Sequence, residues 1–227
     1  MYNSKYLKYA NNQAINNNII MAILYLIAYP TIKIFVFFSI KPNFITSLSL
    51  LFSFIAIFTL LNHQIFYFVI FYFISVHLDF CDGPVARITS RVSRSAFNYD
   101  HLSDLLKFAI TIISIAFFYN KLIYWFVSSL AITTFLFFVI TNHELSYFSK
   151  KVKSEIYDKS FQNKQRLKII ITHLRIIITT ISGHTVLGLI ILPLNYNIAI
   201  IYLVYICTIT FARSCVNIIK LSKIKIY

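Results

Sequence analysis

The sequence has few of the residues from which turns and water-exposed surfaces are built. Its 227 residues include only three glycines and four prolines, and 12% are charged against 59% hydrophobic. A soluble domain has about 45–50% apolar and about 25% charged residues, so a water-soluble globule is excluded. Few glycines and prolines argue against a turn-rich β-barrel, so we predict an all-α polytopic membrane protein. The three cysteines are odd in number and lie in or beside apolar runs, which favours buried thiols over a disulfide framework.

Six apolar stretches are predicted to cross the membrane, since a helical span needs about 20 residues. They are 44–61, 65–78 with some extension, 105–119, 122–140, 169–192 and 198–219. An earlier stretch, 19–40, contains Pro30 and Lys33 and follows an Asn-rich start. This stretch either spans the membrane or lies along its interface. No cleavable signal peptide is predicted, because no small-residue cleavage site follows the apolar run.

The positive charges indicate how the chain is oriented. Lysine and arginine number 21 against seven acids, a net charge of +14. One side of the predicted bundle collects Lys41, Arg87, Arg91, Arg94, Lys107, the polar connection 141–168 and the tail. The opposite side holds little beyond Lys121. The positive-inside rule therefore places the first side in the cytoplasm, facing anionic lipid, and no nucleic-acid partner is expected.

Acids are rare in this chain, and four of the seven fall within one short stretch. They are Asp79, Asp82, Asp100 and Asp104. Asp79 and Asp82 are three residues apart, and Asp100 and Asp104 are four apart, so each pair shares a helical face. The apolar stretches before Asp79 and after Asp104 are nearly equal in length. Antiparallel neighbouring helices would thus bring the four carboxylates to one patch just inside the membrane.

Such a cluster needs compensation, because one carboxylate at the centre of a span costs about 2.5–3.5 kcal/mol. One solution is a structural ion-pair network with Arg87, Arg91 and Arg94. The other is one or two hard divalent cations, Mg²⁺ or Mn²⁺, open to a phosphate. Gly83, beside Asp82, leaves room for a ligand near the backbone, and the planar fork of Arg87 suits a phosphate. These residues favour the cation.

The same residues form a pattern that resembles the CDP-alcohol phosphotransferase family, D-x2-D-G-x2-A-R-x8-G-x3-D-x3-D. Every position matches from Asp79 to Asp104 except the second glycine, which is Ala96 here. The family's Pro-Asn-x-x-Thr stretch is also present, at 42–46. The resemblance implies six spanning helices after an interfacial N-terminal helix. We therefore predict an N-terminal segment over 1–40 and a catalytic membrane domain over 41–227.

The resemblance also implies the reaction, in which an alcohol hydroxyl displaces CMP from a CDP-linked donor, most often CDP-diacylglycerol, during phospholipid biosynthesis. By the same resemblance, two Mg²⁺ or Mn²⁺ ions would be held by the motif aspartates, Asp79, Asp82, Asp100 and Asp104. Asp104 would also be the catalytic base for the acceptor hydroxyl. The cytidine diphosphate would contact Gly83, Ala86 and Arg87. The family is commonly dimeric, which implies a homodimer.

The acceptor alcohol is not named by the motif, because its contacts vary within the family. Many acceptors carry a phosphate, so we consider as binding residues Arg91, Arg94, Arg175 and Arg213. Arg213 is the best single candidate, because an arginine inside a span is a functional candidate. The alternative for Arg213 is snorkelling toward the headgroups.

Three other functions stay open. Ala96 adds a methyl group where the donor approaches, so an inactive relative is one alternative. A divalent-cation transporter or channel is another, although the outer halves of both helices are apolar. An aspartate-rich membrane prenyltransferase is the third, but its family is longer and spaces its aspartates differently. The Asn, Ile, Lys and Tyr bias points to a low-GC genome and hence to a bacterial inner membrane, with the site at its cytoplasmic face.

Overall fold

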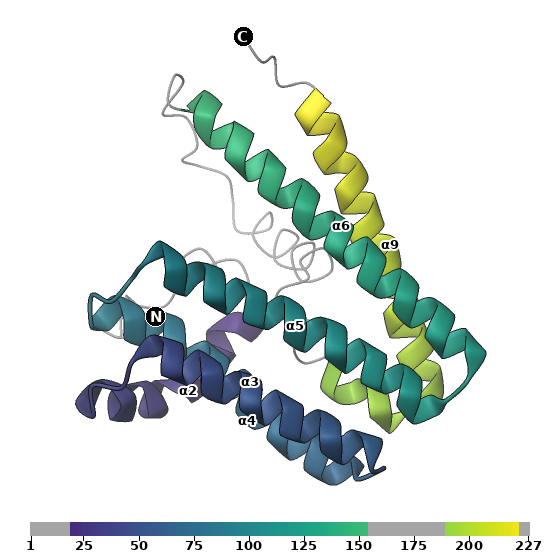
Figure 1. Ribbon diagram of the computed structural model, residues 1–227, viewed down its shortest axis with the longest axis horizontal. Helices are drawn as coiled ribbons and strands as arrows, with labels where there is room; N and C mark the ends of the chain where they lie inside the picture. The colour runs from purple at the N-terminus through teal and green to yellow at the C-terminus, as the bar shows by residue number, and fades with distance from the viewer. Residues whose placement is uncertain (1–18, 154–188, 223–227) are drawn as a thin grey trace.

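The structure is a computed structural model that describes residues 19–153 and 189–222. These residues form helices joined by short connections, with no strand among them. The elements are α2 (Ile19–Phe37), α3 (Pro42–Leu61), α4 (Ile65–Ile88), α5 (Arg94–Tyr119), α6 (Leu122–Lys153), the 3-10 turn η2 (Leu192–Leu194) and α9 (Tyr196–Ser222). Figure 1 shows their arrangement. The predicted all-α class is confirmed for this part of the chain.

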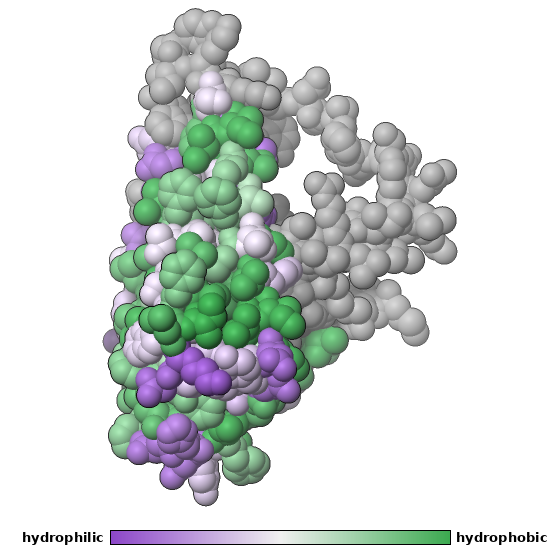
Figure 2. Space-filling model, turned by 90° about the vertical axis from the view of Figure 1, so that its right-hand side faces the viewer, coloured by the Kyte–Doolittle hydropathy of each residue, from purple (hydrophilic) through white to green (hydrophobic). Residues whose placement is uncertain are grey.

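Five helices are long and apolar enough to cross a membrane: α3, α4, α5, α6 and α9. They coincide with the predicted spans 44–61, 65–78, 105–119, 122–140 and 198–219. The sixth predicted span, 169–192, falls largely outside the described residues and stays a prediction. Large apolar side chains are exposed along these helices, and Leu122 is 86% exposed. Figure 2 shows such a surface, on which apolar side chains predominate and polar patches are small. Lipid is the solvent that suits it, so the chain is an integral membrane protein.

Helix α3 lies between α4 and α5 and is the centre of the first helix group. Its buried residues recur every three or four positions and so form one stripe. The stripe includes the small residues Ser49, Ser53 and Ala56. Small side chains let two helix backbones approach closely, which is the main source of packing between helices in lipid. The sequence of α3 therefore places α4 close against it.

Helices α6 and α9 pack against each other along their lengths and form the second group (Figure 1). In that view they rise together away from α5, starting from the α5–α6 turn at Asn120 and Lys121. The α9 face toward α6 again repeats every three or four residues, from Ala199 through Leu203 to Asn217. Polar groups meet near the far end, where the Asn217 amide donates to Thr141 Oγ1 at 3.5 Å. The two groups are thus joined through the α5–α6 hairpin.

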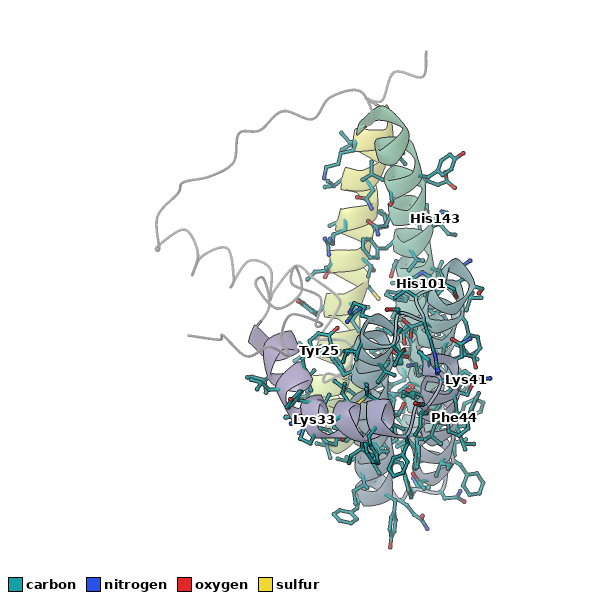
Figure 3. All side chains as sticks on the ribbon, turned by 90° about the vertical axis from the view of Figure 1, so that its left-hand side faces the viewer. Tyr25, Lys33, Lys41, Phe44, His101 and His143 are labelled. Atoms are coloured by element: carbon teal, nitrogen blue, oxygen red, sulfur yellow. The ribbon has the colours of Figure 1, made fainter. Side chains whose placement is uncertain are left out.

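Helix α2 packs on α4 and lies across the bundle, at a steep angle to α6 and α9 (Figure 3). Its buried stripe is Leu24, Ala28 and Ile32. Thr31 Oγ1 is hydrogen-bonded to His77 Nε2 at 2.8 Å, and the Tyr25 ring meets the edge of Phe80 at 5.1 Å. Helix 19–37 is therefore confirmed as a helix, and its place along the membrane interface stays a prediction.

Four helices end in a residue with left-handed backbone that is not glycine. These residues are Ser39 (φ 53°), His63 (φ 58°), Ser90 (φ 55°) and Asn120 (φ 45°). Helices commonly end this way, usually with glycine, because a Cβ is strained in that conformation. Because the chain has only three glycines, serine, histidine or asparagine takes this conformation at the ends of these four helices instead.

Three helices are longer than the apolar stretches that predicted them. Helix α5 begins at Arg94 rather than 105, α4 continues to Ile88, and α6 continues to Lys153. The prediction that a polar connection begins at 141 was therefore wrong for residues 141–153. Hydropathy marks where a helix leaves the lipid, whereas the helix itself continues until its backbone bonds are broken. No glycine or proline interrupts 141–153.

Candidate metal and donor site

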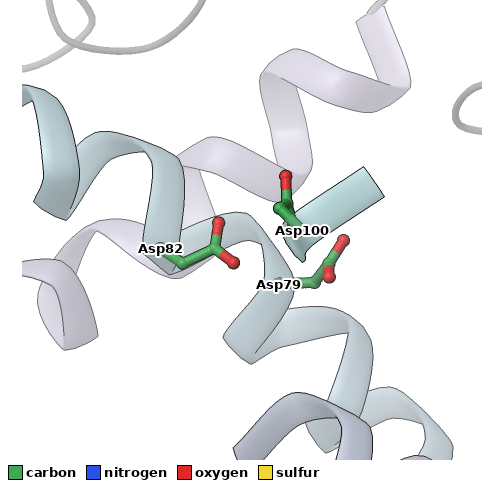
Figure 4. A group of neighbouring side chains, drawn as sticks. All are labelled: Asp79, Asp82 and Asp100. Carbon is green, nitrogen blue, oxygen red and sulfur yellow. The ribbon is translucent and has the colours of Figure 1, made fainter. Parts of the chain in front are cut away.

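Three carboxylates converge where α4 and α5 approach each other. Asp79 and Asp82 lie one turn apart near the end of α4, and Asp100 lies in the second turn of α5. One ligand oxygen from each lies within 4.8 Å of the others, and Figure 4 shows the three side chains around a common space. Hard divalent cations such as Mg²⁺ and Mn²⁺ prefer oxygen ligands such as carboxylates. The residues present therefore fit a divalent cation.

Thr46 holds Asp82 in place. The Asp82 side chain is buried, with the residue 6% exposed, and Thr46 Oγ1 donates to its Oδ2 at 2.6 Å. Thr46 is itself buried in the α3 stripe and also donates to Pro42 O at 3.3 Å. A hydrogen bond to a charged acceptor is worth about 1.5–3 kcal/mol, and outer partners of this kind orient metal ligands. From the sequence, Thr46 was noted only as the last residue of the Pro-Asn-x-x-Thr stretch at 42–46. Its contact with Asp82 was not predicted.

Lys107 joins two of the motif aspartates. Its Nζ donates to Asp104 Oδ1 at 2.8 Å and also to Asp79 Oδ1. The pattern of positive charges placed Lys107 with the cytoplasmic connections, but Lys107 lies within α5 and is only 9% exposed. The signal that could have found it is its position, three residues after Asp104 and inside an apolar span. A lysine there needs a partner, and the same helical face supplies one.

The Lys107 ammonium also has a neutral partner on α3. Its Nζ donates to Ser49 Oγ at 3.3 Å. Ser49 is fixed in turn by Ser75 of α4, because each hydroxyl donates to the other residue's carbonyl, at 2.9 and 2.7 Å. The lysine therefore connects three helices at one level. Breaking a buried pair of this kind by removing one partner costs about 3–5 kcal/mol.

Asp104 lies at the edge of this arrangement rather than inside the three-carboxylate group. Its side chain is 48% exposed, and Lys107 connects it to Asp79. The helix lengths predicted that Asp79 and Asp104 would lie at similar depth, and their shared lysine agrees with this. An accessible carboxylate beside the cluster can meet a substrate hydroxyl.

The donor-motif residues follow directly on α4. A Cβ on Gly83 would lie 3.2 Å from Arg87 Nη1 and 3.4 Å from its Nη2. The missing side chain therefore lets the Arg87 guanidinium fold back over the helix, beside Asp82. The Tyr25 phenol of α2 lies within hydrogen-bonding reach of Arg87. Ala86, the residue before Arg87 on α4, is partly exposed. An arginine held there can meet a phosphate that also reaches the carboxylates.

The four predicted acceptor arginines are spread over the chain. Arg91 lies in the α4–α5 connection, and its Nη1 donates to Ser39 O at 3.1 Å. Arg213 of α9 stacks over the Phe138 ring at 5.2 Å. Arg94 is the first residue of α5, and its side chain is outside the described part. Arg175 lies outside the described residues, as does the Ala96 methyl group. The roles predicted for the four arginines and for Ala96 stay predictions.

Fold and site together define a class: an all-helical membrane protein that gathers aspartates from adjacent spans beside an arginine. The particular family follows from comparison with known families. The chain belongs to the CDP-alcohol phosphatidyltransferase family, whose model matches residues 39–212. No curated protein matches the chain. The matched region contains the whole aspartate motif, and the family carries out phosphotransfer in phospholipid synthesis. This assignment rules out the prenyltransferase alternative.

Proposed function

We propose that the protein transfers the phosphatidyl group of CDP-diacylglycerol to a small alcohol and releases CMP, at the cytoplasmic face of a bacterial inner membrane. The observation that carries the proposal is the group of Asp79, Asp82 and Asp100 oxygens within 4.8 Å, inside the region matched by the family. The lysines and arginines near this end of the helices support the cytoplasmic orientation. The homodimer implied by the resemblance belongs to the same proposal.

In the reaction, the acceptor oxygen attacks the phosphorus that carries the diacylglycerol, and the bond between the two phosphates breaks. Asp79, Asp82 and Asp100, with Asp104 at the edge, would hold Mg²⁺ or Mn²⁺, which would neutralise the charge that develops on the phosphates. Gly83, Ala86 and Arg87 would bind the cytidine diphosphate, with Arg87 supplying a fork of donors.

Asp104 would accept the proton of the attacking hydroxyl. Its side chain is half exposed, so a substrate can reach it, and Lys107 fixes one of its oxygens. A base beside cations is weak, so its main contribution is to orient the hydroxyl for attack. Arg91, Arg94, Arg175 and Arg213 are the candidates for binding a phosphate on the acceptor.

The experiment is CMP release by purified protein in detergent, with CDP-diacylglycerol, Mn²⁺ and a panel of alcohols. Asp82→Asn and Asp104→Asn should abolish release while the protein stays folded. Glu144→Gln is the matched control, because Glu144 is an exposed acid on α6, and it should keep full activity. Retained release in Asp82→Asn would mean that the site is assigned wrongly.

Two alternatives are tested alongside. Mn²⁺ flux into liposomes without any CDP-lipid would support a cation transporter instead. If folded protein releases no CMP with any acceptor, nucleotide binding by an Ala96→Gly variant distinguishes an inactive relative from an enzyme that uses another CDP-linked donor. Recovered binding would assign the loss to the Ala96 methyl group.

A further inference from the structure

We propose that the Lys107 ammonium is a resident cation of the aspartate cluster and takes the place of a second divalent ion. The protein would then bind one divalent ion per chain, at Asp79, Asp82 and Asp100. The inference rests on the proposed function, since it concerns the same site, and it departs from the two ions that the family resemblance implies.

Each N–H donor of the Lys107 ammonium has an acceptor. A lysine side chain has three N–H donors, and Lys107 directs them to Asp79, Asp104 and Ser49. The residue is 9% exposed. Lysines in membrane proteins usually extend to the interface and keep their charge in water. Lys107 instead ends among acceptors on three helices, which is the environment of a bound cation.

The surroundings of the ammonium are fixed by groups that do not titrate. Ser49 and Ser75 exchange hydrogen bonds with each other's carbonyls. Thr111 Oγ1 donates to the Lys107 carbonyl at 2.7 Å, one turn along α5. The serine that receives the third N–H is therefore held between α3 and α4 whatever the state of the carboxylates.

The balance of charge at the cluster also favours one divalent ion. The four motif aspartates carry four negative charges when ionised. Two divalent ions would cancel all four and leave the buried Lys107 charge without a counter-charge, close to both ions. One divalent ion and Lys107 leave a single negative charge, which Arg87 can offset from above Gly83. Since an unbalanced buried charge is unfavourable, the observed lysine fits one ion better than two.

Lys107 is on this account a positioning residue. It divides the motif between two cations, with Asp79 shared by both, because a carboxylate has two oxygens. It also fixes one oxygen of Asp104 at 2.8 Å and so orients the proposed base. The acceptor hydroxyl would then meet a carboxylate whose position does not depend on the divalent ion.

The experiment counts bound Mn²⁺ on the purified full chain in detergent, without CDP-lipid, by equilibrium dialysis and by the electron paramagnetic resonance signal of free Mn²⁺. We expect one ion per chain in the wild type and two in Lys107→Met, because Asp104 becomes available as a ligand. Lys121→Met is the control, since Lys121 lies at the opposite end of α5 and stacks on Tyr196, and it should leave the count at one.

Two tightly bound ions in the wild type would overturn the inference, as would a folded Lys107→Met that still binds one. If Lys107→Met fails to fold, Asp104→Asn decides: an unchanged count and a Kd within about threefold support the lysine, and loss of an ion refutes it. CMP release, measured in parallel, separates the two proposals. Release from a two-ion enzyme refutes only the role of Lys107, and one bound ion without release refutes only the reaction.

Discussion

The hydrogen bond from Thr46 to Asp82 offers the sharpest test of how the site is built. Thr46→Val keeps the shape of the side chain and removes only the donor, which lies 2.6 Å from Asp82 Oδ2. Both residues are buried, so water does not readily replace the lost hydroxyl. The Asp82 carboxylate would then be less well oriented and less stable in its charged form.

The magnitude follows from the part of the bond that differs between the free and metal-bound states. A hydrogen bond to a charged group is worth about 1.5–3 kcal/mol in total. If about half of this is lost from binding, about 0.75–1.5 kcal/mol, the Mn²⁺ affinity falls about 3- to 12-fold. Losses of about 10–100-fold are typical when an outer partner of a metal ligand is removed. Where the two ranges meet, the Kd rises about tenfold, and this is the increase that we expect.

The assay is Mn²⁺ titration of purified protein in detergent, by calorimetry or electron paramagnetic resonance. Thr46→Ser should bind like the wild type, because it keeps the hydroxyl. Thr59→Val is the matched control: Thr59 is a buried threonine of the same helix, about 20 Å away along it, and donates only to Ala56 O among the bonds seen for its hydroxyl. An unchanged Kd in folded Thr46→Val would refute the reasoning. So would a loss in Thr46→Ser equal to that in Thr46→Val.

Three further predictions concern stability, each measured by thermal unfolding in detergent. Ser90→Gly should stabilise by about 0.5–1 kcal/mol, because Ser90 has a φ of 55° and glycine relieves that strain; a lower unfolding temperature would contradict this. Tyr119→Phe should lower the free energy of unfolding by about 1 kcal/mol, because the Tyr119 hydroxyl donates to Leu192 O at 2.7 Å. Tyr67→Phe, the control at an exposed tyrosine, should leave the unfolding temperature unchanged. Removing divalent cations with EDTA should lower the unfolding temperature, and Mn²⁺ at about 100 times its Kd should restore about 2.7 kcal/mol in the wild type but not in Asp82→Asn.

Much of the fold could be predicted because lipid imposes a simple rule on the sequence. Apolar stretches of sufficient length are helices, so 44–61 and 198–219 were located within a few residues. Helix ends were less predictable. The first turns of α5 contain Asp100, Ser103 and Asp104, which look like a connection by hydropathy but form a continuous helix, in which Lys107 pairs with Asp104 one turn earlier.

The site was predictable to the extent that it rests on spacing. The intervals between Asp79, Asp82 and Asp100 indicated convergence, and the three oxygens do converge. Lys107 and Thr46 were not found, because each acts across helices. Serine, threonine and lysine are common in many roles, and only the packing of α3 against α4 and α5 shows which acceptor each one faces.

Helix α2 lies outside the residues that the family model matches, but it packs against them through α4. The family match begins at residue 39, after α2 has ended. Yet α2 buries Leu24, Ala28 and Ile32 and bonds to His77, two residues before Asp79. A chain shortened to the matched residues would keep every motif position and lose the support behind α4. For expression, crystallisation or grafting, α2 therefore belongs with the matched residues.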